Sequence, residues 1–170
     1  MIHHLSISAQ NPQHVAQVLA EIIQRQPTPN PFNPGGYIIF PFDEYGTEIE
    51  VYPLGTEIVP GDSEELRAYI QNTAASQSTA THAMLSVPIN VEQIEQIAAR
   101  EDWLVQRTSF GFDFMMLWVE NRLLIELLTP EMTAQYMAFT QRENLRNYFV
   151  FPDSPDAPKS LQVALQTKHP

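Results

Sequence analysis

The chain of 170 residues contains no cysteine, which excludes disulfides, thiolate metal sites and a cysteine nucleophile. It has only 9 Lys and Arg residues against 20 Asp and Glu, for a formal net charge of −11. Nucleic acid and anionic membrane surfaces are therefore poor partners, and few side chains could bind a strongly anionic substrate. The sequence has no apolar run of membrane-spanning length and no signal-peptide pattern. We expect a soluble cytoplasmic protein that acts on a small molecule.

An internal repeat is the main positive feature. His4 opens one predicted strand and is followed by Ile-Glu-Val around Glu50; His82 opens a second and is followed by Ile-Glu-Leu around Glu126. The separations are 46 residues (4 to 50) and 44 residues (82 to 126). A repeat of this kind indicates one supersecondary unit used twice. With 44% apolar residues, the chain is long enough to bury one core, and we predict a single domain over residues 1–150.

Hydrophobic periodicity and capping residues predict the order strand, helix, strand, strand, strand in the second unit, residues 80–130. Its elements are strand 81–87, helix 91–101 and strands 103–108, 112–120 and 123–129. The first unit, residues 1–54, has strand 2–9, a helix from Asn11-Pro12 to before Pro27, and a hairpin of strands 37–42 and 47–52. Its second strand is missing from the pattern, because the prolines of 27–36 exclude a regular internal strand.

The remaining segments lie outside the two units. Residues 55–79 are polar and predict a linker, with a short helix over 63–71 capped by Ser63 and a flexible stretch over 71–81. Residues 131–147 predict a C-terminal helix. The segment 151–170 is rich in Pro and Asp near its start, and we expect it to be loosely ordered.

Strand alternation places His4 and Glu50 on the face opposite the apolar residues of their strands, and the same holds for His82 and Glu126. If the apolar face of each unit packs on its helix, two such sheets related by a pseudo-twofold axis bring the four side chains together. Imidazole and carboxylate ligands suit Zn, Ni, Co, Mn or Fe. Glu126 stands out because it lies within Leu-Leu-Ile-Glu-Leu-Leu, where an unpaired carboxylate is costly.

These motifs resemble the vicinal oxygen chelate superfamily, the group of glyoxalase I, bleomycin-resistance proteins and extradiol dioxygenases. The resemblance covers residues 2–54 and 80–130 and rests on the His-x-x-hydrophobic and Ile-Glu-hydrophobic patterns, with Asn11 and Asn90 at the helix starts. It implies an α+β fold, in which two βαβββ units form a cupped, mixed sheet with helices on the outside. The predicted C-terminal helix, residues 131–147, lies outside these two units.

The resemblance also implies a divalent metal held by His4, Glu50, His82 and Glu126, with Glu126 as the catalytic base. The expected reaction is that of a glyoxalase-like lyase or isomerase on a small α-oxo or diol-type substrate, through a metal-stabilised enediolate. A non-catalytic binding protein of the bleomycin-resistance type is one alternative, and an iron-dependent extradiol-type dioxygenase is another. Such proteins are often dimers in which sites are completed across the interface, so the resemblance leaves both a monomer and a homodimer open.

Several polar residues near the motifs have simpler interpretations. Glu48 shares a face with Glu50 and would replace it only if the strand register slipped, so we interpret it as a rim residue. His3 is interpreted as a surface residue. Three serines, Ser6, Ser8 and Ser86, are predicted to line the cup as small residues, because no base is placed to activate them as nucleophiles.

Overall fold

Both halves of the chain fold into the same unit in the computed structural model, which describes residues 3–61, 67–149 and 151. The first unit contains β1 His4–Ala9, α1 Pro12–Ile23, β2 Pro27–Pro29, β3 Tyr37–Ile39 and β4 Glu48–Pro53. The second contains β7 Ala83–Ser86, α2 Val91–Glu101, β8 Val105–Ser109, β9 Asp113–Val119 and β10 Leu123–Leu128. The repeat predicted from the sequence is therefore a repeat of structure.

The two sheets have matching topologies, β1-β4-β3-β2 and β7-β10-β9-β8. In each sheet the first and last strands of the unit are parallel neighbours, and the other pairs are antiparallel. The registers also match, because Ser6 lies opposite Glu50 and Met84 lies opposite Glu126. Equivalent His and Glu residues are thus held at equivalent places in the two units.

Helix α1 begins where its sequence predicts. The Asn11 side chain accepts a hydrogen bond from the backbone N–H of His14, and Pro12 occupies the first turn, where its missing donor costs nothing. The buried face of α1, which includes Leu19 and Ile22, packs against β3 and β4. This packing fixes which face of the first sheet is apolar.

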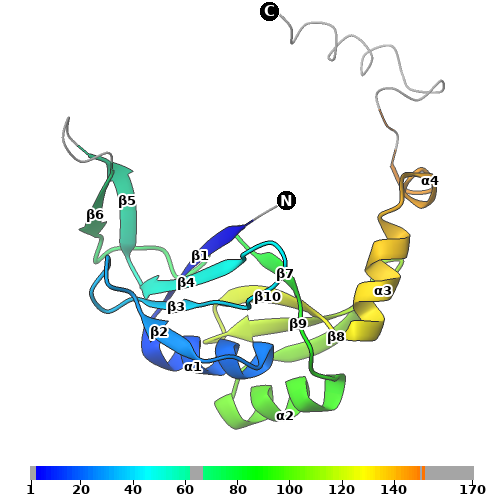
Figure 1. The fold of residues 1–170 in the computed structure, drawn as a ribbon, viewed down its shortest axis with the longest axis horizontal. Helices are drawn as coiled ribbons and strands as arrows, with labels where there is room; N and C mark the ends of the chain where they lie inside the picture. Colours follow the sequence, from blue (N-terminus) through cyan, green and yellow to red (C-terminus); the bar gives the residue numbers. More distant parts are fainter. Residues whose placement is uncertain (1–2, 62–66, 150, 152–170) are drawn as a thin grey trace, which may run out of the picture.

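Helices α1 and α2 lie side by side on one side of the two sheets, and the opposite side is open (Figure 1). The hairpin of β5 Thr56–Pro60 and β6 Arg67–Gln71 stands at one end of this open side, and α3 Pro130–Phe139 stands at the other. The cupped α+β architecture with outer helices is confirmed. Within the described residues, no helix has the length and apolar character needed to cross a membrane.

The Pro-rich segment contains a strand that the sequence interpretation omitted. Residues Pro27–Pro29 form β2, which pairs with β3 through Thr28 opposite Ile38. Because β2 is an edge strand, the backbone nitrogens of its two prolines, which carry no hydrogen, can point away from β3. The backbone of Thr28, between them, pairs with Ile38 of β3. The Pro-rich segment forms no internal strand, as predicted, but it does form an edge strand, so the first unit has the same number of strands as the second.

The helix predicted over 63–71 is wrong for its described part. Residues Arg67–Gln71 form strand β6, and residues 62–66 lie outside the described residues. Cross-strand pairs such as Ile58 opposite Tyr69 explain the outcome, since aromatic and β-branched residues pair well on a sheet. This pairing outweighs the local capping signal of Ser63.

The C-terminal helix is split in two. Helix α3 ends at Phe139, and a short helix α4 spans Arg142–Leu145. The Thr140 hydroxyl donates to the carbonyl of Tyr136 at 3.0 Å, a bond that competes with continuation of the helix. The prediction of a loosely ordered tail concerns residues that lie outside the described ones, apart from Phe151.

Candidate metal centre

The four predicted ligands lie on the open side of the two sheets. Glu50 is in the middle of β4, where its neighbours Ile49 and Val51 are buried on the α1 face. Alternation therefore directs Glu50 to the other face. Glu126 has the same place in β10, between the buried Ile125 and Leu127.

Glu50 accepts hydrogen bonds on both carboxylate oxygens. Its Oε2 accepts from the Tyr52 hydroxyl at 2.6 Å and from the Ser6 hydroxyl at 2.9 Å, and it lies 2.6 Å from His4 Nε2. Its Oε1 accepts from Asn30 Nδ2 at 3.1 Å. Glu50 is only 7% exposed, and these four contacts replace the water that burial removes.

The Pro-rich loop positions Asn30 over this carboxylate. Asn30 Oδ1 accepts from the backbone N–H groups of Phe32 and Asn33, an arrangement that turns the chain and fixes the amide orientation. The Asn30 backbone N–H also donates to the carbonyl of Gly36 at 2.9 Å. The prolines on either side of Asn30 restrict the backbone further. The segment therefore supplies one donor of the site.

These contacts perturb two acid–base groups. Burial raises the pKa of Glu50, but the hydrogen bonds from Tyr52, Ser6 and His4 together lower it by more, so its pKa lies below the ordinary value. The pKa of Tyr52 is raised, mainly by burial and to a smaller extent by its hydrogen bonds with Glu50 and Tyr69. Glu50 is thus held as a carboxylate, and Tyr52 is held as a neutral hydroxyl.

The second pair is more open. His82 Nε2 lies 4.0 Å from Glu126 Oε2, and the two side chains are 52% and 16% exposed. On the neighbouring strands Glu126 faces Met84 and Met116, whereas Glu50 faces Ser6 and Ile38 at the equivalent positions. Within the described part of the chain, His82 is the polar partner of Glu126. Glu126 is consequently a carboxylate without the hydrogen bonds that hold Glu50.

The structure brings His4 together with Glu50, and His82 together with Glu126. Among the described residues, the set of three potential ligands with donor atoms within 4.8 Å of one another is His4, Glu48 and Glu50. His82 and Glu126 lie outside this set. Glu48, interpreted from the sequence as a rim residue, is half-buried opposite His4 in the register.

Each pair would need a small change in spacing to hold a divalent cation. Two ligand atoms about 2.1 Å from one ion are separated by about 3.0–3.4 Å, depending on the coordination angle. His82 and Glu126, at 4.0 Å, would need to approach by about 0.6–1.0 Å. His4 and Glu50, at 2.6 Å, would exchange a hydrogen bond for a shared ion. Imidazole and carboxylate donors suit Mn, Fe, Co, Ni and Zn.

Sequence reasoning missed the residues that hold Glu50. Tyr52 shares a strand face with Glu48 and Glu50, so alternation could have identified it. Asn30 had only a weak signal, an Asn between two prolines in a loop. Its contact with Glu50 depends on how the loop folds over β4, which no local pattern encodes.

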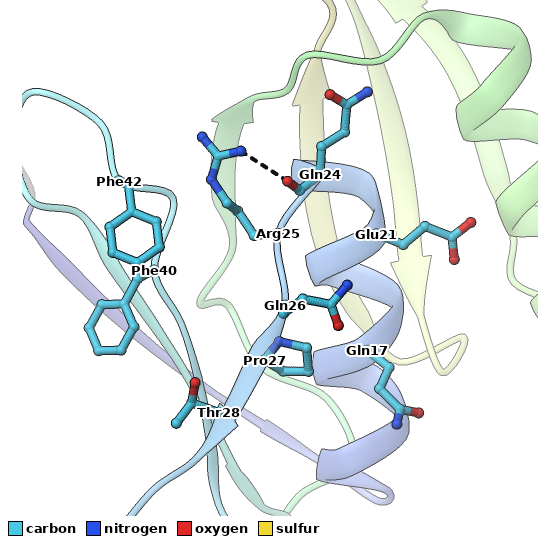
Figure 2. Close-up of a pocket in the computed structure, with 9 residues that line it drawn as sticks. All are labelled: Gln17, Glu21, Gln24, Arg25, Gln26, Pro27, Thr28, Phe40 and Phe42. Atoms are coloured by element: carbon cyan, nitrogen blue, oxygen red, sulfur yellow. Dashed lines mark hydrogen bonds between the residues drawn. The ribbon is translucent and has the colours of Figure 1, made fainter.

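One surface groove borders the residues around Glu50, and another borders the outer helix α1. One, of about 280 Å³, lies next to Glu50 and includes its donors Ser6 and Tyr52. The other, of about 690 Å³, lies between α1 and the aromatic side chains of Phe40 and Phe42 (Figure 2). Its lining has no histidine, and Glu21, its one acidic residue, pairs with Arg100 at 2.7 Å. The groove beside Glu50 is therefore the candidate binding site.

No protein-family profile matches the chain, and no curated protein sequence matches it. Solved structures do match. Fosfomycin resistance protein FosX from Mesorhizobium loti gives a TM-score of 0.51 at 6% identity, over 80% of this chain and 97% of that one. FosX from Listeria monocytogenes, complexed with Mn(II) and sulfate, gives a TM-score of 0.50 at 10% identity, over 88% of this chain and 98% of that one.

A mutant of the Listeria FosX, complexed with Mn(II) and 1S,2S-dihydroxypropylphosphonic acid, gives a TM-score of 0.50 at 11% identity, over 81% and 97% of the two chains. These matches extend over nearly the whole of the solved chains. The likeness is one of fold, and the fold is that of the vicinal oxygen chelate superfamily. The resemblance inferred from the sequence motifs is confirmed at this level.

Proposed function

We propose that the chain is a divalent-metal-dependent enzyme of the glyoxalase type, a lyase or isomerase acting on a small substrate with two adjacent oxygens. His4, Glu50, His82 and Glu126 would be the metal ligands. Mn(II), which the Listeria FosX structures contain, is the first ion to test, followed by Zn, Ni, Co and Fe.

The observation that carries the proposal is the matched placement of the two His and Glu pairs. In each unit the His lies at or just before the start of the first strand, two residues before the residue opposite the Glu in the parallel last strand. A solvent-facing strand acid needs no such repetition. Two imidazoles and two carboxylates arranged this way supply the ligand types that divalent transition metals bind.

The difference between the pairs assigns different roles to the two carboxylates. A bound divalent cation would polarise the two substrate oxygens and stabilise negative charge that develops there. Glu50 is fixed by Ser6, Tyr52 and Asn30, so it would act only as a ligand. Glu126 lacks such bonds and is free to move a proton on the adjacent substrate carbon, which is the work of a general base.

The test is metal content after reconstitution with each ion, measured by elemental analysis for the wild type, His82→Ala and Glu126→Gln. We expect close to one ion per chain in the wild type and at least a tenfold loss of metal affinity in His82→Ala. Glu126→Gln should reduce affinity less and abolish turnover. Matched controls are His3→Ala and Glu92→Gln, which remove an imidazole and a carboxylate outside the four ligands.

Equal metal content in the wild type and His82→Ala would rule out the four-ligand site. A wild type that binds none of the five ions while remaining folded, as judged by circular dichroism, would exclude the enzyme assignment.

A non-catalytic small-molecule-binding protein is the second candidate, and the hydrogen-bonding of Glu50 favours it. Glu50 already has four polar contacts without a metal, so the first pair is stable as a purely structural element. This candidate predicts small-molecule binding that does not depend on metal and is unchanged by Glu126→Gln. Titrations of the metal-free protein and of the variant distinguish it from the enzyme.

A further inference from the structure

The groove beside Glu50 contains a guanidinium that the proposed metal centre does not use. The groove, of about 280 Å³, lies where β1, β4, β5, the segment before β7 and the start of β10 meet. Its lining residues are mostly hydroxyl-bearing: Ser6, Ser8, Tyr52, Thr56, Ser76, Thr79 and Thr81, together with Ile7, Ile58, Arg122 and Leu123. It is a polar groove with one cation.

Arg122 has unused donors. Its Nη2 donates to the carbonyl of Ser8, its Nε is buried without a partner, and its Nη1 makes no bond to the described residues. None of the ion pairs between described residues includes Arg122, whereas Arg100 and Arg107 each pair with carboxylates. A guanidinium with free donors is the side chain best suited to bind a carboxylate or phosphate oxygen.

The nearest acid along the chain does not neutralise Arg122. Both oxygens of Glu120 accept from backbone N–H groups, those of Gln10 at 2.7 Å and Asn11 at 2.8 Å. None of the ion pairs between described residues neutralises the Arg122 guanidinium. Its charge is available to a ligand.

Three hydroxyls of the groove are also available. Ser8, Thr56 and Thr81 line it, and their side chains make no hydrogen bond to the described residues. The hydroxyls of Ser6 and Tyr52 are already bonded to Glu50. The groove therefore offers free hydroxyl groups in addition to the Arg122 guanidinium.

The distance between the two ends of the groove sets a length for its ligand. Arg122 contacts the backbone of Ser8, and Glu50 contacts the side chain of Ser6, two residues earlier on the same strand. Two residues of a β-strand span about 7 Å. A molecule that reaches from Arg122 to the metal centre has an anionic end and two adjacent oxygens separated by a short carbon chain.

We propose that Arg122 binds the remote carboxylate of a short acid, whose vicinal oxygens lie at the metal centre. This inference rests on the proposed function and names its substrate class. A singly charged carboxylate is preferred to a phosphate dianion, because the groove offers one guanidinium in an otherwise acidic protein.

The test compares two probes of equal length, 2-oxoglutarate and 2-oxopentanoate, which share the vicinal oxo-carboxylate and differ only in the remote carboxylate. Binding to the metal-loaded protein is measured by isothermal titration calorimetry. We expect 2-oxoglutarate to bind at least tenfold more tightly in the wild type. The ratio should fall to within about twofold in Arg122→Gln, and it should be unchanged in Arg25→Gln, which removes a guanidinium from the separate groove between α1 and Phe40 and Phe42. Inorganic phosphate, added as a competitor, tests the alternative anion.

Equal affinity for the two probes in the wild type would overturn the proposal, as would an unchanged ratio in Arg122→Gln. Tighter competition by phosphate than by 2-oxoglutarate would overturn the preference for a carboxylate. Chemical-shift mapping of the wild type needs no variant. The backbone amides of Ser8, Thr81 and Leu123 should shift with 2-oxoglutarate and not with 2-oxopentanoate, and the reverse result would count against the site.

The two proposals fail in different ways. Metal content is measured on the same samples. A protein that binds metal but shows equal affinity for the probes retains the metal centre and loses the Arg122 subsite. A protein without metal whose groove amides still respond to the remote carboxylate retains the subsite and loses the enzyme assignment.

Discussion

Glu50 and Glu126 show how two carboxylates at equivalent positions acquire different properties. Glu50 is buried and receives hydrogen bonds from Tyr52, Ser6 and Asn30, which favour its charged form. Glu126 lies between methionines and has a single polar neighbour, His82, among the described residues. The difference arises from the neighbouring residues, since the strand positions are the same.

The pH dependence of stability follows from Glu50. Because its pKa is lowered on folding, its contribution to stability is present above its ordinary pKa of 4.5 and is lost as the pH falls through the lower folded value. In the metal-free protein, Glu50→Gln should cost stability at pH 7, and the difference from wild type should shrink below about pH 4.5. Urea unfolding at several pH values measures this. A difference that stays constant from pH 7 to pH 3 would contradict it.

At the scale of elements, the sequence predicted most of the fold. The helices α1 and α2 and the hairpins of both units were predicted from periodicity and from Asn11 and Asn90, because these signals are local. The hairpin of β5 and β6 was missed because its segment is polar and the sequence signal at Ser63 indicated a helix, whereas the cross-strand pairs that stabilise the hairpin are not visible in a local capping pattern. The His and Glu pairs were located by strand alternation, but the donors to Glu50 come from tertiary contacts that alternation alone does not specify.

The turn between β8 and β9 and helix α3 are in close contact at Gly111. This residue has φ +73°, and a Cβ there would lie 2.4 Å from Phe139 Cε2. We expect Gly111→Ala to reduce the free energy of unfolding by about 2–4 kcal/mol, through backbone strain and displacement of the Phe139 ring. The matched control is Gly46→Ala, where φ is +64° and no atom lies within 4 Å of the added Cβ. Its cost should be limited to backbone strain, about 1–2 kcal/mol. Equal losses in urea unfolding would show that the Phe139 contact does not matter.

At the scale of the whole molecule, the two units are joined by specific polar contacts as well as by a shared core. Glu120, in the turn between β9 and β10 of the second unit, accepts from the backbone N–H groups of Gln10 and Asn11 at the start of α1 in the first. Arg122 follows and donates to Ser8 of β1. The same turn therefore ties the units together and presents the proposed anion-binding residue.

Removal of the Glu120 carboxylate tests this connection. Glu120→Ala leaves two backbone donors at a helix start without their charged acceptor, and each such bond contributes about 1.5–3 kcal/mol. Because water can reach this turn, we expect a loss of about 1–3 kcal/mol in the free energy of unfolding, measured with urea. Glu92→Ala, in the exposed first turn of α2, should change it by less than about 1 kcal/mol. If Glu120→Ala and Glu92→Ala reduced the free energy of unfolding equally, the result would contradict a role for Glu120 in joining the two units.

The parallel pairing of first and last strands also has a consequence for the order of events during synthesis. His4 meets Glu50, and His82 meets Glu126, only after the helix and the two strands between them have been made and folded back. The loop closed by each pair is long, so an early encounter of the partners costs more conformational entropy than a local contact does. We therefore do not expect an ion to act as a nucleus for folding. Any metal would join a unit whose sheet already exists, and its removal by a chelator should leave that sheet intact.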